Sequence, residues 1–448
     1  MSEEIEGHVA ESPARTVFRH SLMTFGTRIG IVLVNIPTSI LVARLLGTEG
    51  QGTYTSAIIF PTMFAFIGLL GVDSAHTFLL SKKRYHVAQI NGQSVLLACL
   101  MSLLIAGAYL LFLRLYPPAA APGLRDVLLL ATALIPVLLA KYLSVAFLLG
   151  LQKIKRFNLA NLLQAGSLLL FMCLNLLLIR GGTRGAIIAY LLSEITVTLL
   201  TFAVAKRVAR GGPLVERPPR ALLRESIGYG LRGHFGNILV QFTYRFDMFL
   251  VLSMVGLSAQ GLYSISVILA EKLSHIPRSV QVVLFPKLSS LSTEEANDLT
   301  PRVVRNSFLL TVMAGAALFL LSRPLLLLFY GTPYLPALQA FRVLIPGVVA
   351  LSISTVLAGD FSGRDRRLYH TVATAIGFAV NIVLCFFWIP RDGIVGAAWA
   401  STVAYTLQAL VLLGFFRKLS GRGLAETIVI QREDLELYAR MLKARFGG

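Results

Sequence analysis

Residues 90–113 have the sequence INGQSVLLACLMSLLIAGAYLLFL, a run that contains no charged side chain. A helix needs about 20 mostly apolar residues to cross a bilayer, so this stretch is long enough. The whole chain of 448 residues is of the same kind, with 56% hydrophobic residues, 14% charged residues and a mean hydropathy of +0.73. Soluble domains carry about a quarter charged residues, and disordered chains have low hydrophobicity. The composition therefore excludes both classes and predicts an all-α, polytopic membrane protein.

The same criterion predicts about twelve membrane spans in all. They lie near residues 21–43, 52–72, 90–113, 126–149, 158–179, 184–205, 227–253, 259–283, 306–330, 336–359, 369–389 and 393–416. A basic segment rich in Pro and Gly, residues 206–226, has the composition of a linker and divides the spans into two sets of six. The predicted organisation is an N-terminal segment (1–20), an N-lobe (21–205), the linker (206–226), a C-lobe (227–416) and a tail (417–448). Within the tail, residues 432–446 form either a short amphipathic helix on the membrane surface or a solvated extension.

The net charge of +19 comes from 41 basic and 22 acidic residues, and the bases lie between apolar runs. That placement argues against a nucleic-acid partner, which would need a basic soluble face. Cytoplasmic loops of membrane proteins carry an excess of Lys and Arg. With the N-terminus in the cytoplasm, about 27 basic residues fall in cytoplasmic segments and about 6 in external ones. The sequence therefore predicts a multi-pass protein of the cytoplasmic (inner) membrane with both termini in the cytoplasm.

The two halves of the chain share a repeated pattern. Gly47-x-x-x-Gln51-Gly52-x-Tyr54 recurs 209 residues later as Gly256-x-x-x-Gln260-Gly261-x-Tyr263. A second block recurs 211 residues later, and its first copy consists of Arg156, Gly166, Arg180, Gly182, Gly185, Ala186 and Ala189. An even number of spans in each half gives both repeats the same orientation in the membrane. Two such lobes enclose a central cleft, which is an architecture typical of transporters.

Three motifs resemble those of a known family. They are ARLLGTEGQGTY at residues 43–54, FPK at 285–287 and IPRDGIVGAAWA at 389–400, which follows Asn381. The chain is similar over residues 15–420 to the polysaccharide biosynthesis flippases of the multidrug/oligosaccharidyl-lipid/polysaccharide exporter superfamily. The resemblance implies two pseudo-symmetric six-helix bundles that move lipid-linked sugars across the cytoplasmic membrane. It does not identify the sugar.

Charged side chains within the spans are the candidate site residues. A charged side chain at the centre of the bilayer costs about 2.5–3.5 kcal/mol even on the translocon-insertion scale, which gives the lowest values. Most of these charged side chains must therefore face protein or water. We expect Arg323 and Arg342 to reach the membrane interface, and the position of Arg278 stays open. The predicted cationic lumen, which suits the phosphates of an anionic substrate, consists of Arg28, Lys141, Arg232, Arg245 and Lys272. Polar residues that share helix faces with these cations are Asn35, Asn237 and Gln241.

The acidic side chains within the spans are fewer. Asp247, Glu194 and Glu271 are each expected to make an interhelical hydrogen bond or ion pair, or to form a coupling-ion site. Glu271 aligns on one helix with His275 and Arg278. No Cys/His cluster has the spacing of a metal site, so no metal is expected.

The leading hypothesis is a flippase for an undecaprenyl-pyrophosphate-linked oligosaccharide that works by alternating access. Its partners would be that substrate and membrane lipid, with polysaccharide polymerase or assembly proteins as further candidates, and it would act as a monomer. A competing hypothesis is a cation-coupled multidrug antiporter, which would need more lumenal carboxylates. A lipid II flippase and a membrane polymerase or ligase complete the set of hypotheses. The chain has no nucleotide-binding motif and no catalytic motif in supporting context, so we expect a non-enzymatic protein without a cofactor. Coupling to H⁺, to Na⁺ or to the membrane potential is left open.

Overall fold

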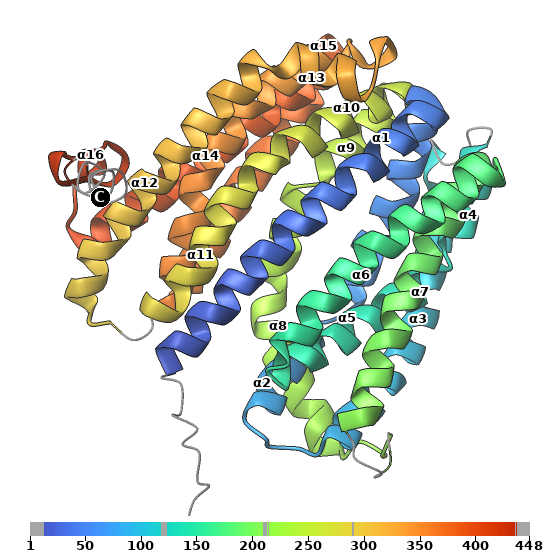
Figure 1. The fold of residues 1–448 in the computed structure, drawn as a ribbon, viewed down its shortest axis with the longest axis horizontal. Coiled ribbons are helices and arrows are strands. Elements are labelled where there is room, and N and C mark those ends of the chain that lie inside the picture. Colours follow the sequence, from blue (N-terminus) through green and yellow to red (C-terminus); the bar gives the residue numbers. More distant parts are fainter. Residues whose placement is uncertain are drawn as a thin grey trace, which may run out of the picture.

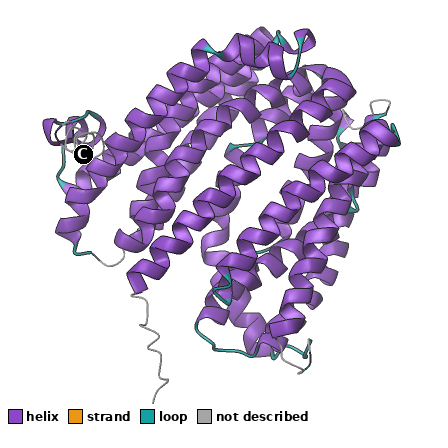
Figure 2. Cartoon of the chain, viewed as in Figure 1, coloured by secondary structure: helices purple, strands orange, loops and turns teal. Residues whose placement is uncertain are grey.

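The computed structural model describes residues 13–117, 123–208, 213, 215–288, 291–434 and 436. Within these ranges the protein is built from helices and connecting turns, and no strand occurs (Figure 2). The all-α prediction is therefore confirmed. The predicted N-terminal segment 1–20 lies largely outside the described residues, as does most of the predicted helix 432–446.

The first lobe contains helices that together make six membrane crossings. They are α1 (Pro13–Gly68), α2 (Val72–Ser81), α3 (Val87–Leu115), α4 (Leu124–Ala131), α5 (Leu134–Gly150), α6 (Ile154–Met172) with the π-helical η2 (Cys173–Leu178), and α7 (Gly182–Val208). α1 is two crossings in one, because the backbone of Gly47 (φ 67°, ψ −174°) is not helical and reverses the chain there. α4 and α5 form one crossing, as do α6 and η2.

The second lobe repeats this arrangement. Its elements are α8 (Arg220–Thr243), α9 (Phe246–Met254), α10 (Leu257–Ala270), the 3₁₀ turn η3 (Glu271–Ser274), α11 (His275–Leu288), α12 (Thr293–Leu320), α13 (Ser322–Phe329), η4 (Thr332–Tyr334), α14 (Ala337–Gly363) and α15 (Arg367–Ser420). α15 also contains two crossings, separated by the non-helical Gly393. Eight of the described helices are long and apolar enough to span a bilayer, and α1 and α15 count twice. The pairs α8–α9 and α10–α11 supply the remaining two crossings, which completes two bundles of six.

The backbone of the two halves repeats where the sequence does. Gly47 and Gly256 both have positive φ, at 67° and 111°, and Gly182 and Gly393 have φ of 58° and 57°. These left-handed conformations favour glycine because a Cβ atom would clash with the neighbouring carbonyl. The turns at Gly47, Gly256 and Gly393 lie at one end of the helices, which we call the motif end. The opposite end, which carries residues 81–87, 215–219 and 363–367, is called the linker end.

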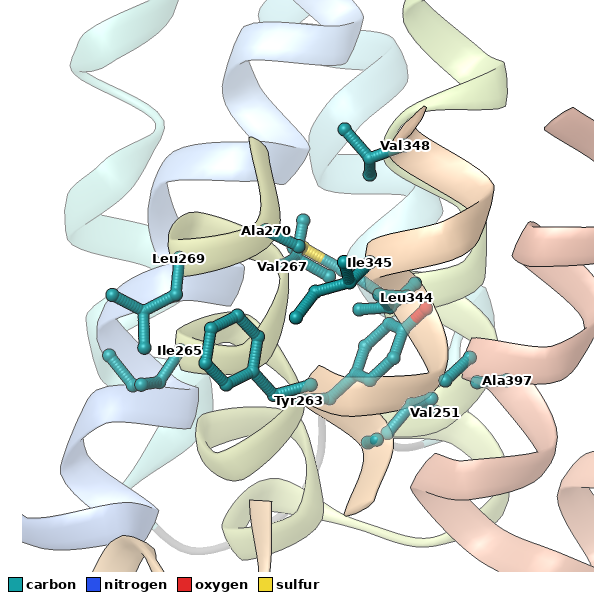
Figure 3. Packing of buried hydrophobic residues seen from close by; sticks show 14 of the residues in the cluster. Val251, Tyr263, Ile265, Val267, Leu269, Ala270, Leu344, Ile345, Val348 and Ala397 are labelled. Carbon is teal, nitrogen blue, oxygen red and sulfur yellow. The ribbon is translucent and has the colours of Figure 1, made fainter. Parts of the chain in front are cut away.

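Each lobe has its own apolar core. In the C-lobe, helices α9, α10, α14 and α15 pack around Tyr263, Val267, Leu344 and Val348 (Figure 3). In the N-lobe, Phe60, Tyr109 and Leu128 belong to the corresponding cluster. The chain between the lobes is shorter than the predicted linker 206–226, since α7 continues to Val208 and α8 begins at Arg220. Pro219 (φ −66°, ψ 148°) caps α8, which fits the fixed φ of proline before a helix.

Two helices lie between the lobes. α1 packs against α6 of its own lobe and against α10 of the other lobe (Figure 1). α8 packs both against α2 and against α15. The α2–α8 contact is close, because the backbones of Gly71 and Gly230 leave no room for a Cβ atom on either residue. Nearby, Ser226 donates a hydrogen bond to Gln93 Oε1 at 3.0 Å.

The segment after α15 folds back onto α12. It contains α16 (Leu424–Ile428), and Arg305 of α12 donates hydrogen bonds to Glu426 O and to Asp434 Oδ1, both at 3.0 Å. Burial acts to raise the pKa of Asp434, but hydrogen bonds from Arg305, Asn306 and the backbone N–H of Gln431 outweigh it and hold the pKa below its ordinary value. A carboxyl group with a lowered pKa stabilises the fold above its unfolded pKa. That stabilisation is lost as the pH falls through the folded pKa.

We therefore expect the tail to detach from α12 in acid, well below the ordinary Asp pKa of about 3.9. Asp434→Asn should release it already at neutral pH, because removing one partner of a buried ion pair costs about 3–5 kcal/mol. Limited proteolysis of residues 421–434 should then be faster by tenfold or more. Glu433→Gln is the matched control, because it removes an ion pair with Arg302 whose side chains are 58% (Arg302) and 71% (Glu433) exposed. Equal cleavage of the two variants would contradict this assignment.

Candidate functional site

A polar cavity of about 510 Å³ lies beside the broken helices of the C-lobe. It is lined by Arg28, Val240, Gln241, Tyr244, Arg245, Ile268, Glu271, Lys272, His275, Arg278, Gln281, Thr355, Ala358 and His370. Arg28 comes from α1, so both lobes contribute to the wall. His370 lies within one turn of the start of α15 and Ala358 close to the end of α14. The cavity therefore extends from mid-helix towards the linker end.

Arg28 and Arg278 lie next to each other in the wall. The Nη1 atom of Arg28 donates to the carbonyl oxygen of Arg278 at 3.5 Å, and the Arg278 guanidinium lies 5.7 Å from the ring centroid of Tyr244. Two neighbouring guanidinium groups repel each other in a site of low dielectric. A doubly charged anion placed between them would relieve that repulsion and accept hydrogen bonds from both.

Arg245 is held by Glu271. Its Nη1 and Nη2 atoms donate to the two carboxylate oxygens at 2.7 and 3.2 Å, and Nη1 also donates to Tyr244 O at 2.9 Å. Both side chains are a little over a quarter exposed, so the pair lines the cavity rather than filling the core. Arg245 also lies in the break between α8, which ends at Thr243, and α9, which begins at Phe246, and its φ is −134°. The ion pair therefore fixes the bend in this crossing.

The remaining charges do not balance. Four permanent cations line the cavity, Arg28, Arg245, Lys272 and Arg278, and Glu271 is the single carboxylate in that lining. Among the described residues, none of Arg28, Lys272 and Arg278 lies within ion-pair distance of an acidic side chain. About three positive charges thus remain uncompensated. Such a wall attracts anions and repels cations.

The structure brings five of the predicted site residues together in this lining: Arg28, Gln241, Arg245, Glu271 and Lys272. It adds Arg278, His275, Gln281 and His370, which were not among the predicted lumen residues. The signal for Arg278 was the alignment with Glu271 and His275, but the 3₁₀ turn η3 and Pro277 interrupt that helix and obscure its phase. For His370 the sequence carries no recognisable signal.

Lys141 lies elsewhere. It comes from α5 and pairs with Glu194 of α7, with 2.8 Å between Nζ and Oε2, inside the N-lobe. Gln164 donates to the other carboxylate oxygen at 3.2 Å. The side chain of Glu194 is completely buried and that of Lys141 is 16% exposed. Lys141 therefore has an acidic partner and is not part of the cavity wall.

Asp247 is buried in the C-lobe. Its carboxylate accepts hydrogen bonds from Tyr263 OH at 2.6 Å, from Ser401 Oγ at 2.9 Å and from the backbone N–H of Met248 at 2.7 Å. Asn381 in turn donates to Ser401 Oγ at 3.2 Å. These bonds join α9, α10 and α15.

Three other predicted residues also lie outside the cavity lining. Arg232 and Asn237 of α8 are exposed, and Asn35 of α1 is half-buried. In the part of the chain that the structure describes, no three His, Cys, Asp or Glu side chains are grouped as a metal site.

Sequence comparison relates the chain to a known protein family and to one curated membrane protein. The sequence model of the family described as "Polysaccharide biosynthesis protein" matches residues 15–292. An uncharacterized membrane protein of Methanocaldococcus jannaschii is 25% identical over 208 residues, which cover 45% of this chain and 40% of that protein. The matched region thus spans well under half the length of this curated relative.

Solved structures of membrane transporters share the architecture at low sequence identity. The lipid II flippase MurJ in an inward closed conformation has a TM-score of 0.68 at 16% identity, over 90% of each chain. An inward-facing multidrug resistance MATE family transporter also has a TM-score of 0.68 at 16% identity, over 90% of this chain and 98% of that one. A MOP superfamily transporter from Pyrococcus furiosus has 0.63 at 15% identity, over 92% and 96%. The chain thus has the same fold as these three transporters. Since the family model matches more than half of the 448 residues, the chain belongs to the polysaccharide biosynthesis protein family.

Proposed function

We propose that this protein is a flippase that moves a polyprenyl-pyrophosphate-linked oligosaccharide from the inner to the outer leaflet of the cytoplasmic membrane. The observation that carries the proposal is the uncompensated positive charge of the cavity, which Arg28, Lys272 and Arg278 provide. Arginine offers paired donors to phosphate oxygens, and lysine adds a point charge. The family assignment supports a sugar carried on a lipid.

The linker end then faces the cytoplasm. It carries most of the basic loops, including Lys82, Lys83, Lys153, Arg364 and Arg366, as the positive-inside rule requires. The cavity, which extends towards this end, would load its anionic headgroup from the cytoplasmic leaflet. A volume of about 510 Å³ suits a pyrophosphate and its first sugar, while the polyprenyl tail stays in the lipid.

The charge balance also bears on the competing hypotheses. A pump for cationic drugs would need carboxylates in the lumen, and here Glu271 is already neutralised by Arg245. Lipid II carries the same pyrophosphate, so the cavity charge does not discriminate against it. We propose a non-enzymatic role, because the cavity residues bind and orient phosphates without a nucleophile paired to a base.

Reconstitution tests the proposal directly. Purified protein in liposomes should move a fluorescent polyprenyl-pyrophosphate oligosaccharide between leaflets, measured as its accessibility to an impermeant quencher. We expect at least a tenfold rate increase over empty liposomes, inhibition by excess inorganic pyrophosphate, and no movement of a cationic dye. Transport of the dye, or of a neutral polyprenyl glycoside at the same rate, would contradict the assignment. A parallel assay with lipid II, compared with the polyprenyl-pyrophosphate oligosaccharide, shows which of these two lipid-linked substrates the protein moves faster.

A further inference from the structure

The motif ARLLGTEGQGTY at residues 43–54 does not contribute to the cavity. The structure places it at the motif end, where the turn after the first crossing meets the turn before α10 (Figure 1). The second copy of the pattern, Gly256–Tyr263, is the segment that it contacts. The repeated sequence thus meets its own repeat across the boundary between the two lobes.

The contact is made by backbone atoms. A Cβ atom on Gly52 would lie 2.0 Å from Leu257 O, and a Cβ atom on Gly261 would lie 1.8 Å from Thr48 O. Thr48 and Leu257 are themselves 209 residues apart, as are Gly52 and Gly261. The two clashes are therefore one contact made twice around the pseudo-two-fold axis, as in an isologous interface. Only glycine at both positions allows the helices to approach this closely.

Hydrogen bonds flank the glycines. Thr48 Oγ1 lies 2.8 Å from Ser258 Oγ, and Gln51 Nε2 donates to Ser264 Oγ at 3.3 Å. Each such bond between small polar groups contributes only modestly to stability, because it replaces hydrogen bonds to water, so the contact can be reversible.

Arg44 extends the contact to the end of α13. Its Nε atom donates to Phe329 O at 2.9 Å and its Nη2 atom to Leu328 O at 2.5 Å, so it caps the carbonyl end of a helix in the other lobe. Ser39 Oγ lies 2.8 Å from Tyr330 OH, and Tyr334 OH donates to Ala43 O at 3.1 Å. Each of these pairs joins the first crossing of the N-lobe to the α13–η4 segment of the C-lobe.

We propose that residues 39–54, 256–264 and 328–334 form a latch that closes the passage at the motif end and opens when the cargo leaves there. This inference rests on the proposed function, because it assigns the latch to the outer gate of an alternating-access cycle. The cavity lies on the linker side of the latch, so cargo in the cavity reaches the opposite face only after these contacts separate. The motif is then repeated because a symmetric closure needs the same glycine in both halves.

A disulfide across the latch tests its role. In a chain whose Cys99, Cys173 and Cys385 are replaced by alanine, Thr48→Cys and Ser258→Cys should cross-link under mild oxidation. Cross-linking should reduce transport at least tenfold, and reductant should restore it. Asp126→Cys with Arg184→Cys is the matched control, because this exposed pair at the same end joins α4 and α7 within one lobe. Absence of the cross-link, or full transport by the cross-linked protein, would overturn the latch.

A second measurement does not depend on the cargo. Thr355→Cys places a thiol in the cavity wall, and an impermeant maleimide added at the motif side labels it only when that side opens. The oxidised 48–258 pair should reduce this labelling at least tenfold, and Gly52→Ala should increase it, since its Cβ atom prevents closure.

If the extent of labelling is the same with and without both changes, the latch is refuted. Labelling that responds in a protein that moves no lipid-linked sugar would support the latch and refute the proposed function. If Gly52→Ala does not fold, the disulfide alone decides.

Discussion

Arg28→Ala should reduce translocation of the lipid-linked sugar by about tenfold to a hundredfold while leaving membrane insertion unchanged. A hydrogen bond to a charged group is worth about 1.5–3 kcal/mol, and about 1.36 kcal/mol corresponds to a factor of ten. Within the described ranges Arg28 makes one long hydrogen bond, at 3.5 Å to Arg278 O, so the fold loses little when the side chain is removed. Initial rates in the quencher assay, at equal amounts of reconstituted protein, measure the effect.

Two further variants sharpen this result. Arg28→Lys keeps the charge but loses the paired donors, so we expect a rate between those of the wild type and the alanine variant. Arg342→Ala is the matched control, because this arginine also lies within a crossing but stacks on Phe319, 5.1 Å from the ring centroid, outside the cavity. A wild-type rate for Arg28→Ala, or an equal loss for Arg342→Ala, would remove Arg28 from the site.

Arg245 is a less direct test of phosphate binding. Its alanine variant would leave Glu271 without its partner and would place a free negative charge in the cavity. The loss of transport that such a variant shows would combine a missing donor with a new repulsion. Arg28 and Arg278 avoid this ambiguity, since no carboxylate within the described ranges pairs with either of them.

The fold could be predicted from the sequence because its determinants are local. Twenty apolar residues in a row define a crossing whatever surrounds them, and the predicted span 90–113 became α3 (Val87–Leu115). The turns at Gly47 and Gly393 lie close to predicted span boundaries, since Gly47 falls between spans 21–43 and 52–72 and Gly393 is the first residue of span 393–416. The sequence did not indicate that crossings seven and eight are each interrupted, at residues 244–245 and at η3 (Glu271–Ser274).

The site was predicted less completely, because the direction of a side chain depends on neighbouring helices. Arg28, Gln241 and Arg245 share helix faces with polar residues, and the structure places all three in the lining of the polar cavity. Lys141 has a similar environment in the sequence, with Ser144 three residues away, yet its partner Glu194 is on another helix. Nothing in the local pattern of either residue indicates the pairing. The sequence alone therefore does not distinguish a charged residue with an ion-pair partner from one without, because the partner is set by how the helices pack.

The Lys141–Glu194 pair leads to the second large prediction. Glu194→Gln and Lys141→Met should each lower the free energy of unfolding by about 3–5 kcal/mol, because each leaves a buried charge without its partner. Lys141→Met combined with Glu194→Gln should lie within about 1.5 kcal/mol of the wild type, since both buried charges are then absent. Equilibrium unfolding in detergent micelles, analysed as a double-mutant cycle, measures the coupling energy.

An exposed ion pair in the same lobe provides the control. Arg184 and Asp126 lie at a similar distance, 2.7 Å, but their side chains are 66% and 59% exposed, against 16% and 0% for Lys141 and Glu194. Exposed pairs contribute about 0.2–1 kcal/mol, so Arg184→Ala should be nearly neutral. If the double variant at 141 and 194 recovers stability but not transport, the pair has a role in the transport cycle, such as binding a coupling ion. If it recovers both, its role is structural, and the cationic site consists of the cavity residues around Arg28.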